Sequence, residues 1–579
     1  MIWLEELNEA PEDQFVAALG GIFEHSPWVA QRAAASRPFG SRLQLHAAMR
    51  AVVAAATIDE QLALIRAHPE LAGKAAVCNE LTAASASEQR GAGLSDCTPD
   101  EFAKLNQLNA RYAAKFDFPF ILAVRGHTPA SIIAQFEARL DHEASQEREV
   151  ALREIGRIAG CRLADAVTTA AGAEIMAMAD CLAQFSEDEA ALTCSYLTPT
   201  HRATARQIQE WMLAAGLEVR TDAVGNVVGR LPGDARTAGT LITGSHYDTV
   251  VNAGRFDGRL GVLLPIVAAM DLRQRKVSLP YHLEVIAFAD EEGVRFNTTF
   301  IGSSAVAGSF DPKMLDCRDA AGVTMREAIR DAGGDPTTIP SIARDPASLL
   351  GYIEVHIEQG PVLLDAQQPL GVVTSIAGSV RYRLSITGLA GHAGTVPMHM
   401  RRDAAAAAAE MVLAVERRCS GQPGLVGTVG RLEVPGGAVN VIPGKCELTL
   451  DLRAGTDSTR DAALGAVLAE VRSIATRRAV QVECHKLMQA AATPCAASFQ
   501  SMLAASITRV THETRPPSLP SGAGHDAMKM AAVTPVGMLF VRCGNGGISH
   551  HPAESLEVGD AELAARVFTD FLQHFRQDS

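Results

Sequence analysis

The feature that most constrains the fold is a set of polar segments in the second half of the chain, two of which directly follow short apolar runs. Residues 240–243 and 283–289 predict buried strands, and each leads straight into a polar segment. The carboxyl ends of neighbouring parallel strands meet at one edge of a sheet, where α/β proteins usually bind their ligands. We therefore predict an α/β domain with its functional site at that edge.

Five polar segments occur in order along this part of the chain. They are residues 245–248 (SHYD), 256–258 (FDG), 290–293 (DEEG), 356–361 (HIEQGP) and 549–550 (SH). Mixed imidazole and carboxylate donors suit zinc, manganese or cobalt, whereas an all-thiolate set would suit structural zinc or an iron–sulfur cluster. Two such cations about 3.5–4 Å apart can share a carboxylate and lower the pKa of a shared water towards about 7. The combination predicts a hydrolytic two-metal site.

The alternation in residues 352–358 (YIEVHIE) indicates which side of that strand carries the chemistry. A period of two puts Glu354, His356 and Glu358 on one face, so His356 faces away from the apolar side. A single histidine at a strand end is more often a hydrogen-bonded structural residue, and adjacent carboxylates such as Glu291 and Glu292 are usually solvated. The prediction of a metal site therefore depends on the five segments occurring together.

From about residue 170 to the C-terminus, these segments resemble the two-metal amidohydrolase family that contains allantoate amidohydrolase, N-carbamoyl-L-amino acid hydrolase and β-ureidopropionase. The resemblance implies two divalent metal ions, Mn²⁺ or Zn²⁺, whose ligands are His246, Asp257, Glu292, His356 and His550, with Asp257 bridging. It implies Glu291 as the general base and Asp248 as the residue that orients His246. Only the Ser-His pattern of the family favours His550 over the adjacent His551.

Further segments resemble a smaller inserted α/β domain, a lid expected over residues 383–492. They are residues 391–394 (GHAG), 440–443 (NVIP) and 451–453 (DLR). The resemblance implies that His392 and Asn440 polarise the substrate oxygen, often from a neighbouring subunit, and that Arg453 pairs with the substrate carboxylate. Gln359 and His525 are expected to line the same site, although a structural role fits either equally well. The family further implies a homodimer formed through the inserted domain.

The N-terminal part, to about residue 168, predicts an all-α domain. Residues 57–60 (TIDE) and 98–101 (TPDE) fit capping boxes, the second with proline at the first helical position. Apolar residues then recur at three- and four-residue steps, which predicts one buried stripe: Phe102, Leu105, Leu108, Tyr112 and Phe116.

Residues 67–74 (AHPELAGK), 85–89 (SASEQ) and 118–121 (FPFI) resemble 2-oxo-4-hydroxy-4-carboxy-5-ureidoimidazoline (OHCU) decarboxylase. The resemblance implies that His68 and Glu88 form the catalytic pair, that Ser85 and Gln89 contact substrate, and that no cofactor takes part. A histidine beside a glutamate can hold and deliver a proton near neutral pH. From local pattern alone, residues 85–88 would instead be a capping box and His68 the end of a helix.

Length and charge limit the remaining possibilities. A chain of 579 residues exceeds one ordinary domain, and we expect boundaries at 1–168, at 174–382 with 493–579, and at 383–492. The net charge of −14 gives no electrostatic reason to expect nucleic acid, and no basic run indicates a membrane surface. The sequence contains no secretory signal or membrane-spanning run, and its eleven cysteines are unpatterned. These features predict a cytoplasmic protein, and the net charge still allows the small acidic ureides that the resemblance implies to bind through local arginines.

The two resemblances imply two reactions of one pathway. The first domain would convert OHCU to (S)-allantoin with loss of CO₂, and the second would hydrolyse allantoate to ureidoglycine, ammonia and CO₂. The fusion favours allantoate, since the metal ligands alone do not distinguish it from other carbamoyl substrates. The alternatives are an N-carbamoyl-L-amino acid hydrolase, a ureidoglycolate hydrolase or a dipeptidase, with the helical part as a non-catalytic docking module.

Overall fold

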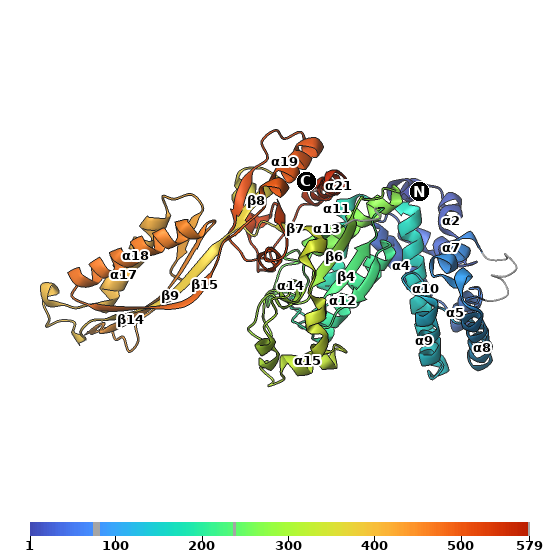
Figure 1. Cartoon of the computed structure of the whole chain (residues 1–579), viewed down its shortest axis with the longest axis horizontal. Helices are drawn as coiled ribbons and strands as arrows, with labels where there is room; N and C mark the ends of the chain where they lie inside the picture. Colours follow the sequence, from blue (N-terminus) through green and yellow to red (C-terminus); the bar gives the residue numbers. More distant parts are fainter. Residues whose placement is uncertain (73–81, 235–238, 577–579) are drawn as a thin grey trace.

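The chain forms three parts in a row, of which the computed structural model describes residues 1–72, 82–234 and 239–576 (Figure 1). We call them the helical domain (1–168), the large domain (169–377 and 491–576) and the small domain (378–490). The helical and small domains lie on opposite sides of the large domain. Gly73 and Lys74, at the end of the expected 67–74 segment, fall outside the described residues. Within those ranges, no helix has both the length and the apolar character needed to cross a membrane.

The helical domain confirms the predicted fold class for the N-terminal part of the chain. Its helices are α1 (Leu4–Glu9), α2 (Glu12–Leu19), α3 (Pro27–Ala33), α4 (Arg42–Ala55), α5 (Ile58–Arg66), α7 (Ala83–Gly91), α8 (Pro99–Phe116), α9 (Pro129–Arg139) and α10 (Ala144–Ala166). Both predicted capping boxes are present, at Thr57 and Thr98. Strand β1 (Ile2–Trp3) pairs in parallel with β2 (Val167–Thr168), so the two ends of the domain lie side by side.

Helix α8 contributes an apolar stripe to the core of this domain. Leu105, Leu108, Tyr112 and Phe116 are buried, and the Tyr112 ring meets the rings of two further phenylalanines edge-on. Phe102, in the first turn, is 38% exposed, so the predicted stripe is wrong at its N-terminal end. Periodicity identifies the face of a helix that is buried, but it does not say where along the helix its packing partners end.

The large domain is built on a nine-stranded sheet. Its strands are β3 (Glu218–Thr221), β4 (Val227–Leu231), β5 (Thr240–His246), β6 (His282–Phe288), β7 (Leu349–Ile357), β8 (Leu370–Ile376), β16 (Thr493–Pro494), β17 (Ser518–Ser521) and β18 (Val536–Val541). The order is β16-β8-β18-β7-β5-β6-β4-β3, with β17 against β8. Strands β18, β7, β5 and β6 are parallel neighbours. The polar segments that follow β5, β6 and β7 therefore reach one edge of the sheet.

Helices enclose this sheet. The long ones are α11 (Ala171–Ala183), α12 (Pro199–Ala214), α13 (Leu260–Gln274), α19 (Ala497–Thr511) and α21 (Val558–His574), and the short ones are α14 (Ile301–Val306), α15 (Met325–Asp331), α16 (Val362–Asp365) and α20 (Ala527–Met530). Helix α13 is buried almost all round, because it packs on β5, β6 and β7 and is itself covered by α11 and α21.

The small domain has its own sheet and its own hydrophobic core. Its strands are β9 (Gly378–Thr387), β10 (Gly391–His392), β11 (Leu425–Thr428), β12 (Leu432–Glu433), β13 (Val441–Ile442), β14 (Lys445–Ala454) and β15 (Gln481–Ala490). The order β11-β14-β9-β15 is antiparallel, and alternate residues of β14 are buried. Helices α17 (Ala404–Cys419) and α18 (Asp457–Arg477) pack on this sheet. Its first strand begins at Gly378, before the expected start at 383.

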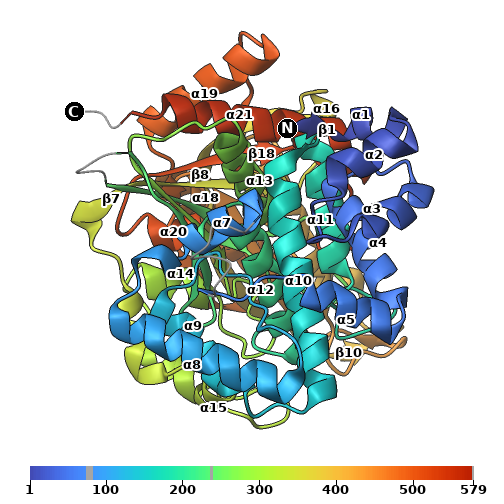
Figure 2. The same ribbon diagram turned by 90° about the vertical axis from the view of Figure 1, so that its right-hand side faces the viewer.

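The helical domain is attached to the large domain through two helix pairs. Helix α10 packs on α12 and α4 packs on α11 (Figure 2). At the second contact, the backbone N–H of Arg42 donates to Glu174 at 2.9 Å, and its guanidinium lies 3.3 Å from the same carboxylate. Both side chains are buried, so this ion pair fixes the first turn of α4 against α11.

His201 of α12 makes the stability of the large domain depend on pH. Its Nε2 lies 2.6 Å from the carbonyl oxygen of Ala289, its ring stacks on Tyr247, and burial lowers its pKa to about 4. In the unfolded chain its pKa is about 6.5, so below that pH the unfolded state binds the extra proton and gains stability. We expect acidification from pH 7.5 to 5 to lower the free energy of unfolding by about 2 kcal/mol through this residue.

Urea denaturation of the wild type and of His201→Gln at both pH values measures this contribution. The variant should lose less stability on acidification than the wild type. An equal loss in the two proteins would contradict the assignment.

Candidate metal centre and second candidate site

Six side chains meet at the carboxyl edge of the large sheet. His246 ends β5, Glu291 and Glu292 follow β6, and His356 lies near the end of β7. Loops before α13 and before α21 supply the last two, Asp257 and His550. Overlapping groups of these residues present ligand atoms within 4.8 Å of one another. The structure thus brings together all five expected metal ligands and the expected base.

Asp257 lies at the centre of the cluster. Its Oδ1 is 3.3 Å from His356 Nε2 and 3.7 Å from His246 Nε2, whereas its Oδ2 is 3.0 Å from His550 Nε2. His550 Nε2 is also 3.3 Å from Glu292 Oε1. The two oxygens of Asp257 therefore face two different ligand groups, as a bridging carboxylate would. Among the residues that the structure describes, its buried Oδ1 has no hydrogen-bond partner, which suits a cation ligand.

The imidazoles of His246 and His356 are oriented by contacts of their Nδ1 atoms with groups around the cluster. His246 Nδ1 faces the Asp248 carboxylate at 3.4 Å, and that carboxylate accepts the backbone N–H groups of Glu291 and Glu292 at 3.1 and 3.2 Å. His356 Nδ1 lies 2.8 Å from the carbonyl oxygen of the next residue. In both rings Nε2 is consequently left to face Asp257, which is the usual arrangement around metal-binding histidines.

The turn after Asp257 requires glycine. Gly258 has a φ of +65°, and a Cβ there would lie 2.4 Å from the His246 ring. Its N–H also lies 3.2 Å from His356 Nε2. Any side chain at this position would therefore push the His246 imidazole away from Asp257.

The cluster is rich in buried carboxylates. Burial, reinforced by the nearby carboxylates of Glu292 and Asp526, holds the pKa of Glu291 well above its ordinary value. Burial likewise raises the pKa of Glu292 to about 7. The hydrogen bond to Asp257 raises the pKa of His550 to about 9. Such a concentration of negative charge favours bound cations, which would reverse these upward shifts for the carboxylates.

Two supporting carboxylates were not identified from the sequence. Glu554 accepts the backbone N–H of Asp257 at 3.2 Å, and it accepts the Ser549 hydroxyl at 2.9 Å. Glu354 accepts the Ser245 hydroxyl at 2.7 Å and is fully buried. The alternation that puts Glu354 on the same face as His356 is a signal for the second residue. No local pattern marks Glu554.

Three of the expected substrate-binding residues lie at or beside the cluster. Gln359 Nε2 donates to Asp257 Oδ2 at 2.9 Å. The His525 ring packs on that of His356, with centroids 4.5 Å apart, and burial holds its pKa well below the ordinary value. Arg453, from the small domain, donates at 2.8 Å to a backbone carbonyl in the loop just before His525.

His392 and Asn440 lie together but on the small domain. His392 pairs with the residue after Asn440 between β10 and β13, and the N–H of Ala393 donates to the carbonyl of Asn440 at 3.0 Å. Both residues are exposed, on a domain that projects away from the sheet edge (Figure 1). His551 is also exposed, and its Nδ1 accepts the N–H of Ala553 at 3.0 Å, outside the cluster.

A second candidate site lies in the helical domain. His68, Ser85, Glu88 and Gln89 line a cavity of about 30 Å³. His68 Nδ1 lies 2.9 Å from a backbone carbonyl, its Nε2 is buried with no partner among the described residues, and burial lowers its pKa to about 4. The N-cap of α7 is Thr82, not Ser85, so the capping-box alternative is wrong. The alternative that His68 marks the end of a helix agrees with the structure, since α5 ends at Arg66.

Arg162 of α10 completes this site and was not identified from the sequence. Its guanidinium binds both oxygens of Glu88 at 2.8 and 3.0 Å, and it also contacts Glu24 at 2.6 Å and the Ser85 hydroxyl at 3.2 Å. Glu88 therefore pairs with Arg162, and it lines the same cavity as His68, with which it is expected to form the catalytic pair. A buried guanidinium in this position suits recognition of a carboxylate.

Comparison with known proteins separates the helical domain from the rest of the chain. Residues 8–164 match the family model of OHCU decarboxylase, and residues 242–574 match that of peptidase family M20/M25/M40. The second family depends on divalent metal ions, in agreement with the donor set of the cluster.

Individual relatives cover the large and small domains. N-carbamoyl-L-amino acid amidohydrolase of Geobacillus stearothermophilus is 40% identical over 64% of this chain and 90% of its own length. Allantoate deiminase 1 of Glycine max is 39% identical over 68% of this chain and 87% of its own length. A solved amidase of the hydantoinase/carbamoylase family from Burkholderia multivorans has a TM-score of 0.65 at 30% identity, and the match covers 69% of this chain and 97% of that one. The chain therefore belongs to the M20/M25/M40 family and carries an OHCU decarboxylase domain in front of it.

Proposed function

We propose that the chain is a bifunctional enzyme of ureide catabolism. The helical domain would decarboxylate OHCU to (S)-allantoin, and the large domain would hydrolyse allantoate to ureidoglycine, ammonia and CO₂. The observation that supports this proposal is that an OHCU decarboxylase domain and a cluster of residues able to hold divalent ions occur in one chain. Opening of the allantoin ring separates the two reactions, so we do not expect direct transfer between the sites.

The metal centre would carry out the hydrolysis. His246, Asp257, Glu292, His356 and His550 would hold two divalent ions, Mn²⁺ or Zn²⁺. When bound, these ions supply positive charge that polarises a carbonyl group and lowers the pKa of water. Glu291 would take a proton from the attacking water and return it to the leaving nitrogen. Arg453 would bind the substrate carboxylate, while His392 and Asn440 would stabilise the negative oxygen.

The helical domain would act without a cofactor. A neutral His68 with a free Nε2 can accept a proton from substrate and return one to the carbon that loses carboxylate. Arg162 and Glu88 would orient the substrate together with Ser85 and Gln89. The support for this proposal is that all five residues line one cavity.

We also infer a homodimer formed through the small domain, in which each site uses His392 of its partner. Apolar side chains exposed on the loops of this domain support the inference: Leu389, Met398, Met400, Val434 and Val439. Mixing inactive His392→Ala with inactive Glu291→Gln should then restore about a quarter of the wild-type ammonia release, because half of the dimers would contain one complete site. A mixture that stays inactive after subunit exchange would show that His392 acts within its own chain.

A substrate panel tests the hydrolytic function. Ammonia release by the manganese-loaded protein would be compared for allantoate, N-carbamoyl amino acids and ureidoglycolate. The second candidate is N-carbamoyl-L-amino acid hydrolysis, since the Geobacillus enzyme of that name is as similar to this chain as the soybean deiminase. A preference for allantoate would support the proposal. A preference for a carbamoyl amino acid would leave the two-metal chemistry intact but refute the pathway argument.

Metal removal should separate the two activities. Treatment with a chelator is expected to abolish ammonia release from allantoate, because the water would no longer be activated, while OHCU decarboxylation continues at its original rate. Adding back Mn²⁺ or Zn²⁺ should restore ammonia release. Loss of decarboxylation on chelation would contradict a cofactor-free helical domain.

A further inference from the structure

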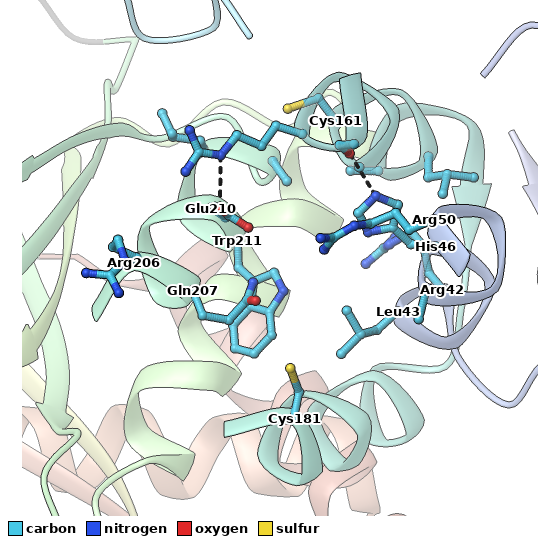
Figure 3. A pocket seen from close by; sticks show the side chains of 18 of the residues that line it. Arg42, Leu43, His46, Arg50, Cys161, Cys181, Arg206, Gln207, Glu210 and Trp211 are labelled. Carbon is cyan, nitrogen blue, oxygen red and sulfur yellow. Dashed lines mark hydrogen bonds and ion pairs between the residues drawn. The ribbon is translucent and has the colours of Figure 1, made fainter. Parts of the chain in front are cut away.

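A cavity of about 570 Å³ lies between the helical domain and the large domain, apart from both candidate sites. Helices α4 and α10 form its wall on one side, and α11 and α12 form it on the other. In Figure 3, His46 and Arg50 face Arg206 and Gln207 across the cavity, with the Trp211 indole between them. Its volume is that of a typical small-molecule site, and such sites often lie between domains.

The wall is basic although the whole chain is acidic. Six arginines line it, against four acidic residues, in a chain of net charge −14: Arg42, Arg50, Arg125, Arg153, Arg157 and Arg206. The four acids are already paired. Glu154 and Glu210 both contact Arg157, Glu174 contacts Arg42, and Asp180 contacts Arg255.

Three of the six arginines form no ion pair with a described carboxylate. In the parts of the chain that the structure describes, Arg50, Arg153 and Arg206 have no carboxylate within 4 Å. All three are exposed, whereas the paired arginines of the wall are buried or half-buried. Unpaired guanidinium groups on cavity walls contributed by two domains are suited to a ligand with more than one negative oxygen.

The helix packing leaves room for this arrangement. Gly156 and Gly160 stand one turn apart on α10, and a Cβ at each would lie 3.3 Å from Arg50 Nε and 3.2 Å from the His46 ring. His46 Nε2 is 2.8 Å from the carbonyl oxygen of Gly156. The two glycines therefore let His46 and Arg50 lie flat along α10, at the cost in helix propensity that glycine carries.

We propose that this cavity binds a small dianion of the carboxylate or phosphate type, held by Arg50 and Arg206 from the two domains. Arg153 would add a third positive charge. A ligand held in this way would bridge the helical and large domains without entering either catalytic site.

Trp211 provides a local readout, because the chain contains only two other tryptophans, Trp3 and Trp28. The Trp3→Phe/Trp28→Phe protein, full-length and metal-loaded, would be titrated at constant ionic strength with inorganic phosphate in one arm and glutarate in the other. We expect a saturable change of Trp211 emission in at least one arm. The arm that responds identifies the phosphate or the carboxylate class.

Variants then test the arginines. Adding Arg50→Ala and Arg206→Ala should raise the midpoint of the titration at least tenfold, whereas adding Arg472→Ala, an exposed residue of the small domain, should leave it unchanged. Ammonia release from allantoate by the double variant should match that of the wild type, which reports an intact fold. No saturable change in either arm, or an unchanged midpoint in the double variant, would overturn the proposal.

Discussion

Replacing Glu291 with glutamine is expected to lower ammonia release from allantoate by about 10²–10⁴-fold, the usual contribution of a positioned general base. The amide cannot take up a proton, but it keeps the size of the side chain. Glu291 lies beside the metal cluster in a buried position, next to the ligand Glu292. Since the five expected ligands are untouched, the variant should bind as much metal as the wild type.

Elemental analysis and single-turnover ammonia release measure these two quantities. The matched control is Glu189→Gln, an exposed glutamate in a loop of the large domain, which should retain full activity. Retained activity in Glu291→Gln would eliminate the proposed base. A parallel loss of metal and activity would indicate that Glu291 acts as a ligand.

The second large effect is expected in the helical domain. His68→Asn should lower OHCU decarboxylation by about 10²–10⁴-fold, because the amide cannot exchange a proton at the position of Nε2. His68 Nε2 is buried without a partner in the described parts of the chain, and the pKa of His68 is lowered, so the ring is neutral and able to accept a proton. The rate of CO₂ release from OHCU would be measured for the variant and for the wild type.

Each activity is the internal control for the other. His68→Asn should release ammonia from allantoate at the wild-type rate, and Glu291→Gln should decarboxylate OHCU at the wild-type rate. Loss of both activities in His68→Asn would indicate misfolding or coupled domains. Unchanged decarboxylation would leave the helical domain as a docking module.

Much of the fold and of the metal site could be predicted from the sequence, because the signals are local. Apolar runs that lead into polar segments predicted β5 and β6. Alternation predicted β7, with His356 and Glu354 on one face. Parallel pairing of these strands then brings their ends to one edge, so the expected ligands on them lie close together. The capping boxes at Thr57 and Thr98 were also predictable, because each is formed by residues only three positions apart.

Other parts of the sites depend on residues far apart in the chain. Arg162 reaches Glu88 across 74 positions, and Glu554 reaches Asp257 across 297. The residues next to an arginine in a helix, or to a glutamate in a polar loop, do not indicate which distant residue it contacts. For this reason the sequence does not show that Glu88, expected to act together with His68, is held by a bidentate contact from α10.

The sequence by itself determined which strands carry the chemistry, which donor atoms are available and which kinds of reaction they allow. Those properties follow from local periodicity and from the side chains themselves. Only the tertiary structure decided which carboxylates support the expected metal ligands, that His392 and Asn440 are exposed and lie away from the sheet edge, and that a basic cavity opens between α4, α10, α11 and α12. These depend on how whole elements pack, and packing is set by contacts that no short window of sequence contains.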